Sequence, residues 1–167
     1  MTPAELLTDS LDRVQESVDA VLDGLGDDDL VARPAPDANT IAWLVWHLTR
    51  VTDDHVAEVA GSEQVWTADG YAARFGLPFD DAAIGYGQTT EEVGQVQASA
   101  DLLGDYHRAV HARAVDYLSG LGADDLDRVV DERWDPPVTL GVRLVSVVND
   151  ATQHAGQAAY VRGLLTR

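Results

Sequence analysis

The sequence predicts an all-α protein built as a four-helix bundle. Four long segments carry apolar residues at the three- and four-residue spacing of helices, and none shows the alternation of a convincing strand. Helix-capping residues precede three of these segments, and glycines follow three of them. At 167 residues the chain has the length of one domain, which we expect to span residues 1–167.

The first helix is expected over residues 3–25. Thr2 and Glu5 have the spacing of a capping box, and Pro3 suits the first helical position. Two glycines end the pattern, and an acidic connection that contains prolines follows. The apolar positions of this helix are Leu6, Leu7, Leu11, Val14, Val18, Val21 and Leu22.

The second helix is expected over about 40–60, with Asn39 or Thr40 as its cap and Gly61 at its end. Residues 62–88 follow it, and they are too aromatic for a solvated linker and too rich in glycine for a helix. A long ordered loop of this kind is often functional. The apolar face of the second helix consists of Ile41, Leu44, Leu48, Val51 and Val59.

The third and fourth helices are expected over about 90–120 and 139–165. Thr89 and Glu92 form a second capping box before the third helix. Between the two helices, an acidic stretch ends in WDPPV, whose paired prolines favour an extended or turn segment. The start of the fourth helix is β-branched, but no turn signal interrupts the pattern that follows, which favours a helix.

Composition limits the partners and the chemistry. The net charge of −18 argues against nucleic acid and against an anionic membrane as partners. With no secretory signal and no apolar run of membrane-spanning length, we expect a cytoplasmic protein. The chain has no Cys and no Lys, so a thiol nucleophile must come from outside the chain, and a metal must be held by His, Asp, Glu or carbonyl oxygen.

Three residues predict a metal site. Asp150 and His154 lie four residues apart in the fourth helix, so they share one face and can offer an oxygen and a nitrogen to the same point. His47 lies on or beside the apolar face of the second helix, and the three groups converge if these helices pack together. Three ligands with open positions are typical of a catalytic metal site. The alternative is a His–Asp hydrogen bond inside the bundle.

A second pair of histidines and one aspartate are weaker candidates for metal ligands. His107 and His111 have the spacing of a metal-binding pair, but their charged neighbours indicate a solvated face. Asp54 follows His47 by seven residues and could accept a hydrogen bond from it or be a fourth ligand, although a surface charge is the simpler interpretation. His55 is expected to be exposed or at the end of the bundle.

Two polar residues near the predicted ligands are candidates for substrate binding. Arg50 could contact an anionic group of the substrate, or it could pair with Asp53 or Asp54. Gln157 could orient substrate or a bound water, or it could be an ordinary polar helix residue. Two tryptophans beside His47 are interpreted as core or as pocket wall. No catalytic residue is assigned from the sequence.

The segments that carry these residues resemble the DinB-like superfamily, in its actinobacterial branch related to mycothiol-dependent maleylpyruvate isomerase and thiol S-transferases. The resemblance rests on NTIAWLVWHLTRVTDDHVAEVAG, GLPFDDAAIGYGQTTEEV and DATQHAGQAAYVRGLL. It implies a four-helix bundle with an open three-ligand metal site, a homodimer, and His47 as the ligand from the second helix. Many members carry a second His where this chain has Asp150, while the isomerase relatives use a carboxylate there.

The resemblance and the donor set together leave three functional hypotheses. Two His and one carboxylate suit zinc, nickel, manganese or iron(II). The first hypothesis is an S-transferase or isomerase in which this metal activates an external thiol that attacks an electrophile. The second is a metal-dependent hydrolase that activates water, and the third is a metal-binding stress-response protein without enzymatic activity.

Overall fold

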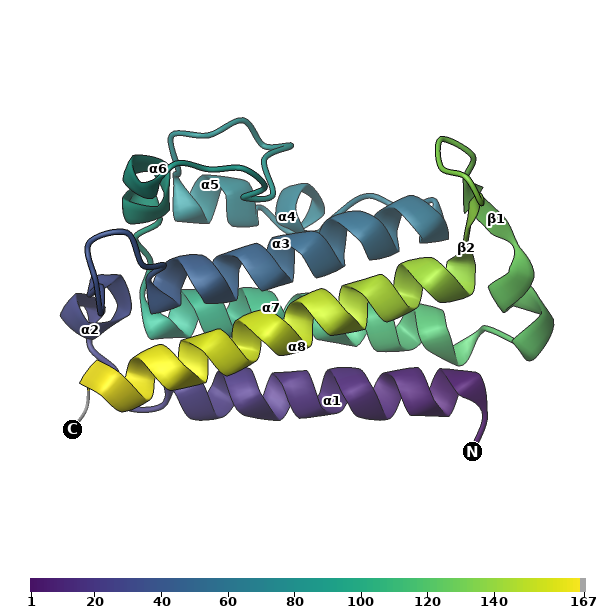
Figure 1. The fold of residues 1–167 in the computed structure, drawn as a ribbon, viewed down its shortest axis with the longest axis horizontal. Coiled ribbons are helices and arrows are strands. Elements are labelled where there is room, and N and C mark those ends of the chain that lie inside the picture. Colours follow the sequence, from purple (N-terminus) through teal and green to yellow (C-terminus); the bar gives the residue numbers. More distant parts are fainter. Residues whose placement is uncertain (166–167) are drawn as a thin grey trace.

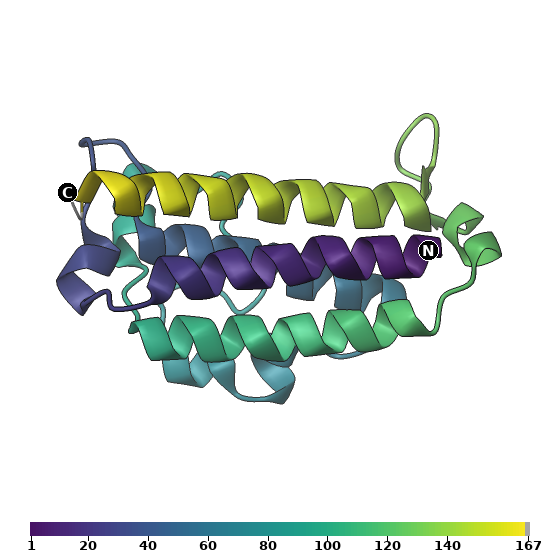
Figure 2. The ribbon, with the colours of Figure 1, turned by 90° about the horizontal axis from the view of Figure 1, so that it is seen from below.

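Four long helices lie side by side in the computed structural model, which describes residues 1–165 (Figure 1). They are α1 (Pro3–Leu22), α3 (Ile41–Ala60), α7 (Ala100–Ser119) and α8 (Leu140–Leu165). Helix α3 packs against α7 and α8, and α1 packs against the same two helices from the other side. Figure 2 shows α1 lying between α7 and α8. The prediction of an all-α four-helix bundle is confirmed.

Helix α1 begins as predicted and ends earlier. The Thr2 side chain accepts a hydrogen bond from the Glu5 backbone N–H, and the Glu5 carboxylate accepts one from the Thr2 N–H, which completes the capping box. The helix ends at Leu22, Asp23 is its C-cap, and Gly24 then adopts a φ of +72°. A short helix that the sequence did not predict, α2 (Asp27–Val31), follows in the acidic connection.

Helix α3 has the predicted limits but not the predicted amphipathic character. The Thr40 hydroxyl accepts a hydrogen bond from the Trp43 N–H at 3.1 Å, and Gly61 ends the helix in the left-handed region. Every residue from 41 to 53 is buried, polar ones included. The connection that follows α3 covers the side of this helix that faces away from the bundle (Figure 1). Helix α3 is therefore the central helix of the molecule.

The connection after α3 contains two short helices where a loop was predicted, α4 (Val65–Ala68) and α5 (Tyr71–Phe75). The buried carboxylate of Asp53 accepts hydrogen bonds from the N–H groups of Val65 and Trp66, at 2.9 and 2.8 Å, so a residue of α3 caps α4. Burial raises the pKa of Asp53 above its usual value, although these bonds and the one donated by the Tyr106 hydroxyl act in the opposite direction.

The predicted third helix consists of two helices. Helix α6 (Thr90–Gln95) ends at Val96, and Ser99 then caps α7 by accepting from the Leu102 N–H at 3.2 Å. Val96 is fully buried, so the break turns an apolar side chain into the core. The single long helix expected over 90–120 was wrong in this respect.

A small antiparallel hairpin lies between α7 and α8. After a 3₁₀ helix, η1 (Ala123–Asp127), strand β1 (Val129–Asp131) pairs with β2 (Val138–Thr139), and the Asp135–Pro136 peptide between them is cis. The sequence predicted an extended or turn segment here but no strand pair. The hairpin stands at the end of the bundle where α8 begins (Figure 1).

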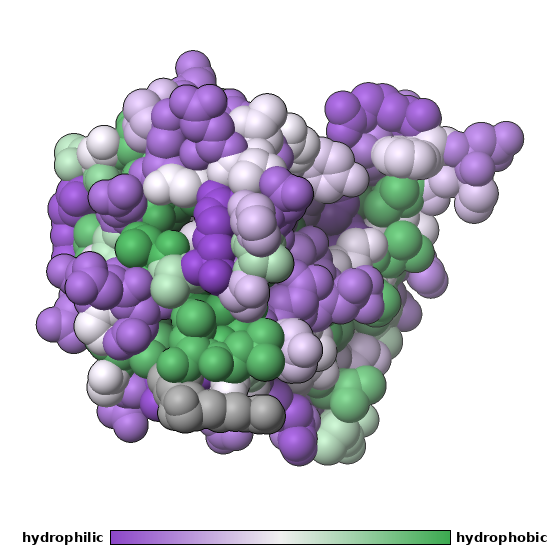
Figure 3. Space-filling model, turned by 60° about the vertical axis from the view of Figure 1, so that its left-hand side comes forward, coloured by the Kyte–Doolittle hydropathy of each residue, from purple (hydrophilic) through white to green (hydrophobic). Residues whose placement is uncertain are grey.

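Acidic residues outnumber basic ones by 29 to 11, and of the acidic residues that the structure describes only Asp53 and Asp131 are buried. Figure 3 shows one end of the molecule, where hydrophilic residues surround separate apolar patches. None of the helices in the described part of the chain combines the length and the apolar character needed to cross a bilayer. The cytoplasmic location stays a prediction.

Candidate metal centre

The packing of α3 against α8 brings together His47, Asp150 and His154. Each of these side chains offers one ligand atom, and the three atoms lie within 4.8 Å of one another. Helices α3 and α8 make the largest helix–helix contact in the bundle and lie side by side in Figure 1. The three residues therefore form a group that could hold a metal ion, as the sequence predicted they would if these helices packed together.

The imidazole of His47 is fixed by a backbone carbonyl from a distant loop. Its Nδ1 lies 2.5 Å from the carbonyl oxygen of Ile84, and because a carbonyl only accepts, Nδ1 must carry the proton. The lone pair is then on Nε2, the atom left for a ligand. The Trp43 ring stacks on the imidazole at 4.6 Å, and burial lowers the pKa of His47, which favours the neutral form that metals bind.

The two ligand candidates on α8 are less buried than the sequence suggested. About a fifth of the His154 side chain and a third of the Asp150 side chain are exposed, while His47 is buried. His154 Nδ1 faces the Gln157 side-chain oxygen at 3.0 Å, and its Nε2 lies 3.5 Å from Asp150 Oδ1. The contact with Asp150 raises the pKa of His154, although burial opposes it. The site is thus closed on the α3 side and open on the α8 side.

One carboxylate oxygen without a hydrogen-bond partner bears on whether His47, Asp150 and His154 suit a cation. Asp150 Oδ2 is buried and has no hydrogen-bond partner. A buried carboxylate oxygen without a donor is costly, and a cation removes that cost. Ligand atoms around a tetrahedral ion stand about 3.4 Å apart, while the three atoms here lie within 4.8 Å of one another. The partly exposed side chains of Asp150 and His154 would therefore shift slightly toward His47 to bind an ion. Two imidazoles and a carboxylate are a suitable donor set for such an ion.

The loop that holds His47 needs glycine at position 85. Gly85 has a φ of +93°, and a Cβ there would lie 2.6 Å from His47 Nδ1 and 3.1 Å from the Trp46 ring. The sequence predicted an ordered, functional loop here but not this contact. The glycines on either side of Tyr86 indicated a special loop, but they did not identify His47 as the residue that the loop contacts.

Arg50 is placed where a substrate could not reach it without rearrangement. It is fully buried, and its guanidinium donates to the carbonyl oxygens of Asp81 and Ala83 at 3.0 and 3.1 Å and to Gln64 Oε1 at 2.7 Å. It also lies 3.8 Å from the Asp53 carboxylate. The surroundings support the alternative interpretation, an ion pair with Asp53, and do not favour a substrate contact.

Gln157, the other predicted substrate residue, lies on the open side of the site. Its side-chain oxygen accepts from His154 Nδ1–H, which leaves the lone pair of His154 on Nε2. Gln157 therefore orients a ligand candidate in this structure, and a direct contact with substrate stays a prediction.

His107 is not on a solvated face, so the predicted exposure was wrong for this residue, while His111 is partly exposed. His107 is buried and its Nδ1 donates to the Thr49 hydroxyl at 3.0 Å, because that hydroxyl already donates to the Val45 carbonyl. His111, one turn later, faces Asp12 of α1 at 2.8 Å. Charged residues next to His107 in sequence point to other faces of α7, which is why the local pattern misled.

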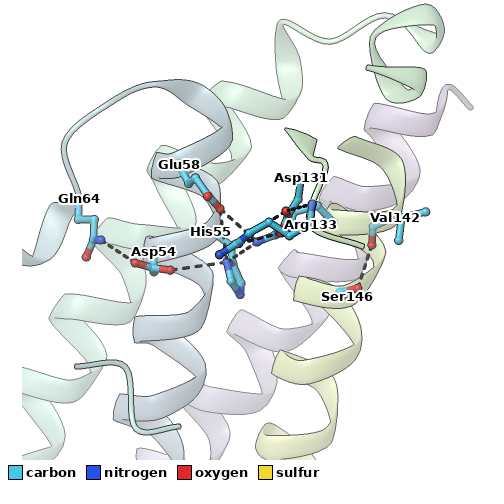
Figure 4. Close-up of polar contacts among 9 residues, drawn as sticks. Asp54, His55, Glu58, Gln64, Asp131, Arg133, Val142 and Ser146 are labelled. Carbon is cyan, nitrogen blue, oxygen red and sulfur yellow. Dashed lines mark hydrogen bonds and ion pairs between the residues drawn. The ribbon is translucent and has the colours of Figure 1, made fainter. Parts of the chain in front are cut away.

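Asp54 and His55 belong to a separate polar cluster at the other end of α3. Asp54 accepts from the Gln64 amide at 2.8 Å and makes no recorded contact with His47, so it is not a fourth member of the group. Arg143 links His55, Glu58 and Asp131 across α3, α8 and the hairpin. Figure 4 shows this arrangement, in which Asp54 and His55 lie side by side. The cluster ties the hairpin to the bundle.

Comparison with known proteins relates this fold and this site to other chains. The sequence model described as Mycothiol-S-transferase matches residues 6–167. The crystal structure of a conserved protein from Enterococcus faecalis is similar over 99% of this chain and 98% of that chain, with a TM-score of 0.93 and 34% sequence identity. No curated protein matches the sequence.

Proposed function

Since the chain belongs to the mycothiol S-transferase family, we propose that it is a metal-dependent enzyme that uses a small external thiol of the mycothiol type as an S-transferase or isomerase. Family membership confirms the predicted resemblance to the DinB-like superfamily. The observation that carries the proposal is the convergence of His47, Asp150 and His154, with one Asp150 oxygen left unpartnered.

We assign the three residues as ligands of a divalent ion: zinc, nickel, manganese or iron(II). His47 would bind through Nε2, because Ile84 holds the proton on Nδ1. His154 would bind through Nε2 as well, because its Nδ1 faces Gln157. Asp150 brings the negative charge that partly offsets the charge of the ion.

A thiol nucleophile has to arrive with a cosubstrate, since the chain contains no Cys. A divalent ion at this site would lower the pKa of a thiol that binds to it. The open side at Asp150 and His154 lets the thiol enter and lets its proton leave to solvent. The thiolate sulfur would then form a bond to the electrophilic atom of the second substrate. The electron pair of the bond that this atom gives up would leave with the departing group in a transfer, or move to the neighbouring atom, which takes a proton from solvent, in an addition. Trp43 forms an apolar wall beside His47.

The test is a comparison of metal content and thiol transfer in two histidine variants. We expect purified protein to contain about one divalent ion per chain, and His154→Ala to lose both the ion and thiol-dependent turnover. His111→Ala is the matched control, because His111 pairs with Asp12 outside the site. Full activity of a metal-free His154→Ala protein would refute the proposal.

Two other outcomes of the same experiment would support the alternatives. Turnover of esters, amides or lactones without any thiol would favour a metal-dependent hydrolase, which the open side of the site also allows. Wild-type protein that takes up no divalent ion would favour a role without catalysis. The homodimer stays a prediction, and light scattering should give about twice 18.0 kDa if it is correct.

A further inference from the structure

The residues of α3 that face the connection above it form one stripe of hydrogen-bond donors. Trp43, His47 and Arg50 follow one another at intervals of four and three residues, so they share one side of the helix. Their ring or guanidinium N–H groups all donate to the segment Asp81–Gln88. We call this segment the docked loop.

The acceptors of the docked loop run antiparallel to the donors. Trp43 Nε1 donates to the Gln88 side chain at 2.7 Å, and His47 donates to the Ile84 carbonyl. Arg50 donates to the carbonyls of Ala83 and Asp81. The contact between His47 and the Ile84 carbonyl fixes the His47 tautomer. Ala83, the residue before Ile84, accepts a hydrogen bond from Arg50.

Arg50 holds the docked loop more rigidly than a lysine side chain would. Its planar fork reaches two carbonyls of the loop at once, and it is itself held by Gln64 and by the charge of Asp53. The guanidinium is fully buried, so these bonds are shielded from water. The position of the Ile84 carbonyl therefore depends on a side chain one turn along the same helix as His47.

We propose that Arg50 is a positioning residue for the metal centre, which acts through the docked loop to fix the orientation and tautomer of His47. This inference rests on the proposed function, because it takes His47 as a metal ligand. Arg50 does not contact the metal or the substrate in this role. Partners that orient a ligating histidine typically contribute 10- to 100-fold to metal affinity.

Two substitutions test the two connections separately, that of Arg50 to the docked loop and that of the loop to His47. Arg50→Lys keeps the charge beside Asp53 but cannot reach both carbonyls with a planar fork. Gly85→Ala leaves Arg50 intact and places a Cβ against His47 Nδ1, which forces the loop and the imidazole apart. Leu118→Val is the control for lost stability, because Leu118 lies in a core cluster that contains none of the residues of the donor stripe.

The first measurement is the affinity for Zn²⁺ by competition with a chromogenic chelator. We expect Arg50→Lys and Gly85→Ala each to weaken binding by about 10-fold or more, and Leu118→Val to bind like the wild type. If both residues act through the loop, the double variant should be no weaker than the weaker single variant. Additive losses would mean that Arg50 acts independently of the loop, and would overturn the inference.

The second measurement reads the tautomer without any metal. Imidazole ¹H–¹⁵N spectra of the metal-free wild type should show His47 with its proton on Nδ1, and the two variants should show a mixture of tautomers or exchange broadening. A merely structural role of Arg50 would leave this signature unchanged. Should Arg50→Lys not fold, Gly85→Ala still tests the docked loop through which Arg50 is proposed to act. Wild-type affinity with a wild-type tautomer in Gly85→Ala would overturn the inference.

Failure of this inference is distinguishable from failure of the proposed function. If the wild type binds no divalent ion, the proposed function falls. If the wild type binds one ion and both variants bind it equally well, only the role of Arg50 falls.

Discussion

At the scale of single residues, Asp150 supplies the only carboxylate of the three grouped side chains. Carboxylates suit harder ions such as manganese, while an all-imidazole set favours zinc and nickel. We therefore expect Asp150→His to raise the preference for Zn²⁺ over Mn²⁺ by about 10-fold, which corresponds to about 1.4 kcal/mol. Loading with a mixture of both ions and elemental analysis would measure it, and an unchanged ratio would show that Asp150 does not set the choice.

His107 predicts how stability depends on pH. Burial lowers its pKa from 6.5 to about 3. Between these values the unfolded chain binds a proton that the folded chain does not, so acidification lowers the free energy of unfolding by up to about 1.4 kcal/mol per pH unit. Above pH 7 this effect is absent.

The variant that removes this effect is His107→Leu, since Thr49 keeps its bond to Val45. Its free energy of unfolding should fall less between pH 6.5 and pH 5 than that of the wild type, measured by urea denaturation at both pH values. Leu118→Val, which removes no titratable group, should keep the wild-type slope. A wild-type slope in His107→Leu would mean that His107 is protonated in the folded state.

The sequence could predict the grouping of His47, Asp150 and His154, because a spacing of four residues fixes two of them on one helix face. It could not predict the contact with Ile84, because a backbone carbonyl 37 residues away carries no side-chain signature. It offered the pairing of Arg50 with Asp53 as one alternative, but it could not predict the contacts of Arg50 with the carbonyls of Asp81 and Ala83. These contacts depend on the path of a loop rather than on residue type.

At the scale of elements, the cap of α3 is the clearest target. The Thr40 hydroxyl accepts from the Trp43 N–H, and Thr40 is only 1% exposed, so water cannot replace it. We expect Thr40→Ala to lower the free energy of unfolding by about 1–2 kcal/mol and Thr40→Ser to retain most of it. Chemical denaturation of both variants would check this, and equal losses would mean that the Thr40 methyl group, rather than its hydroxyl, matters.

The limits of the long helices were predictable where caps and glycines mark them, as at Thr40 and Gly61. The break between α6 and α7 was not, because residues 96–99 contain no glycine or proline and only Ser99 marks the new start. The burial of every residue from 41 to 53 of α3 was also missed. The sequence indicated one apolar face, but the polar residues Arg50 and Asp53 are buried as well, as a pair.

At the scale of the whole molecule, the net charge of −18 works against the folded state. Salt shortens the screening length from about 10 Å at 0.1 M to about 3 Å at 1 M. We therefore expect the melting temperature of the metal-free protein to rise as NaCl is increased over this range. A falling melting temperature would show that favourable ion pairs, such as those of Arg143, outweigh the repulsion.

The unequal burial of the two helices at the metal centre has a kinetic consequence. His47 lies in the part of α3 in which every residue from 41 to 53 is buried, so a large shift of its side chain requires the surrounding core to open. Asp150 and His154 are on a helix with a solvent-facing side, and small local fluctuations there are enough to separate them. On the proposed assignment, local fluctuations of α8 would therefore set the rates at which an ion enters and leaves, and α3 would form the rigid side of the site.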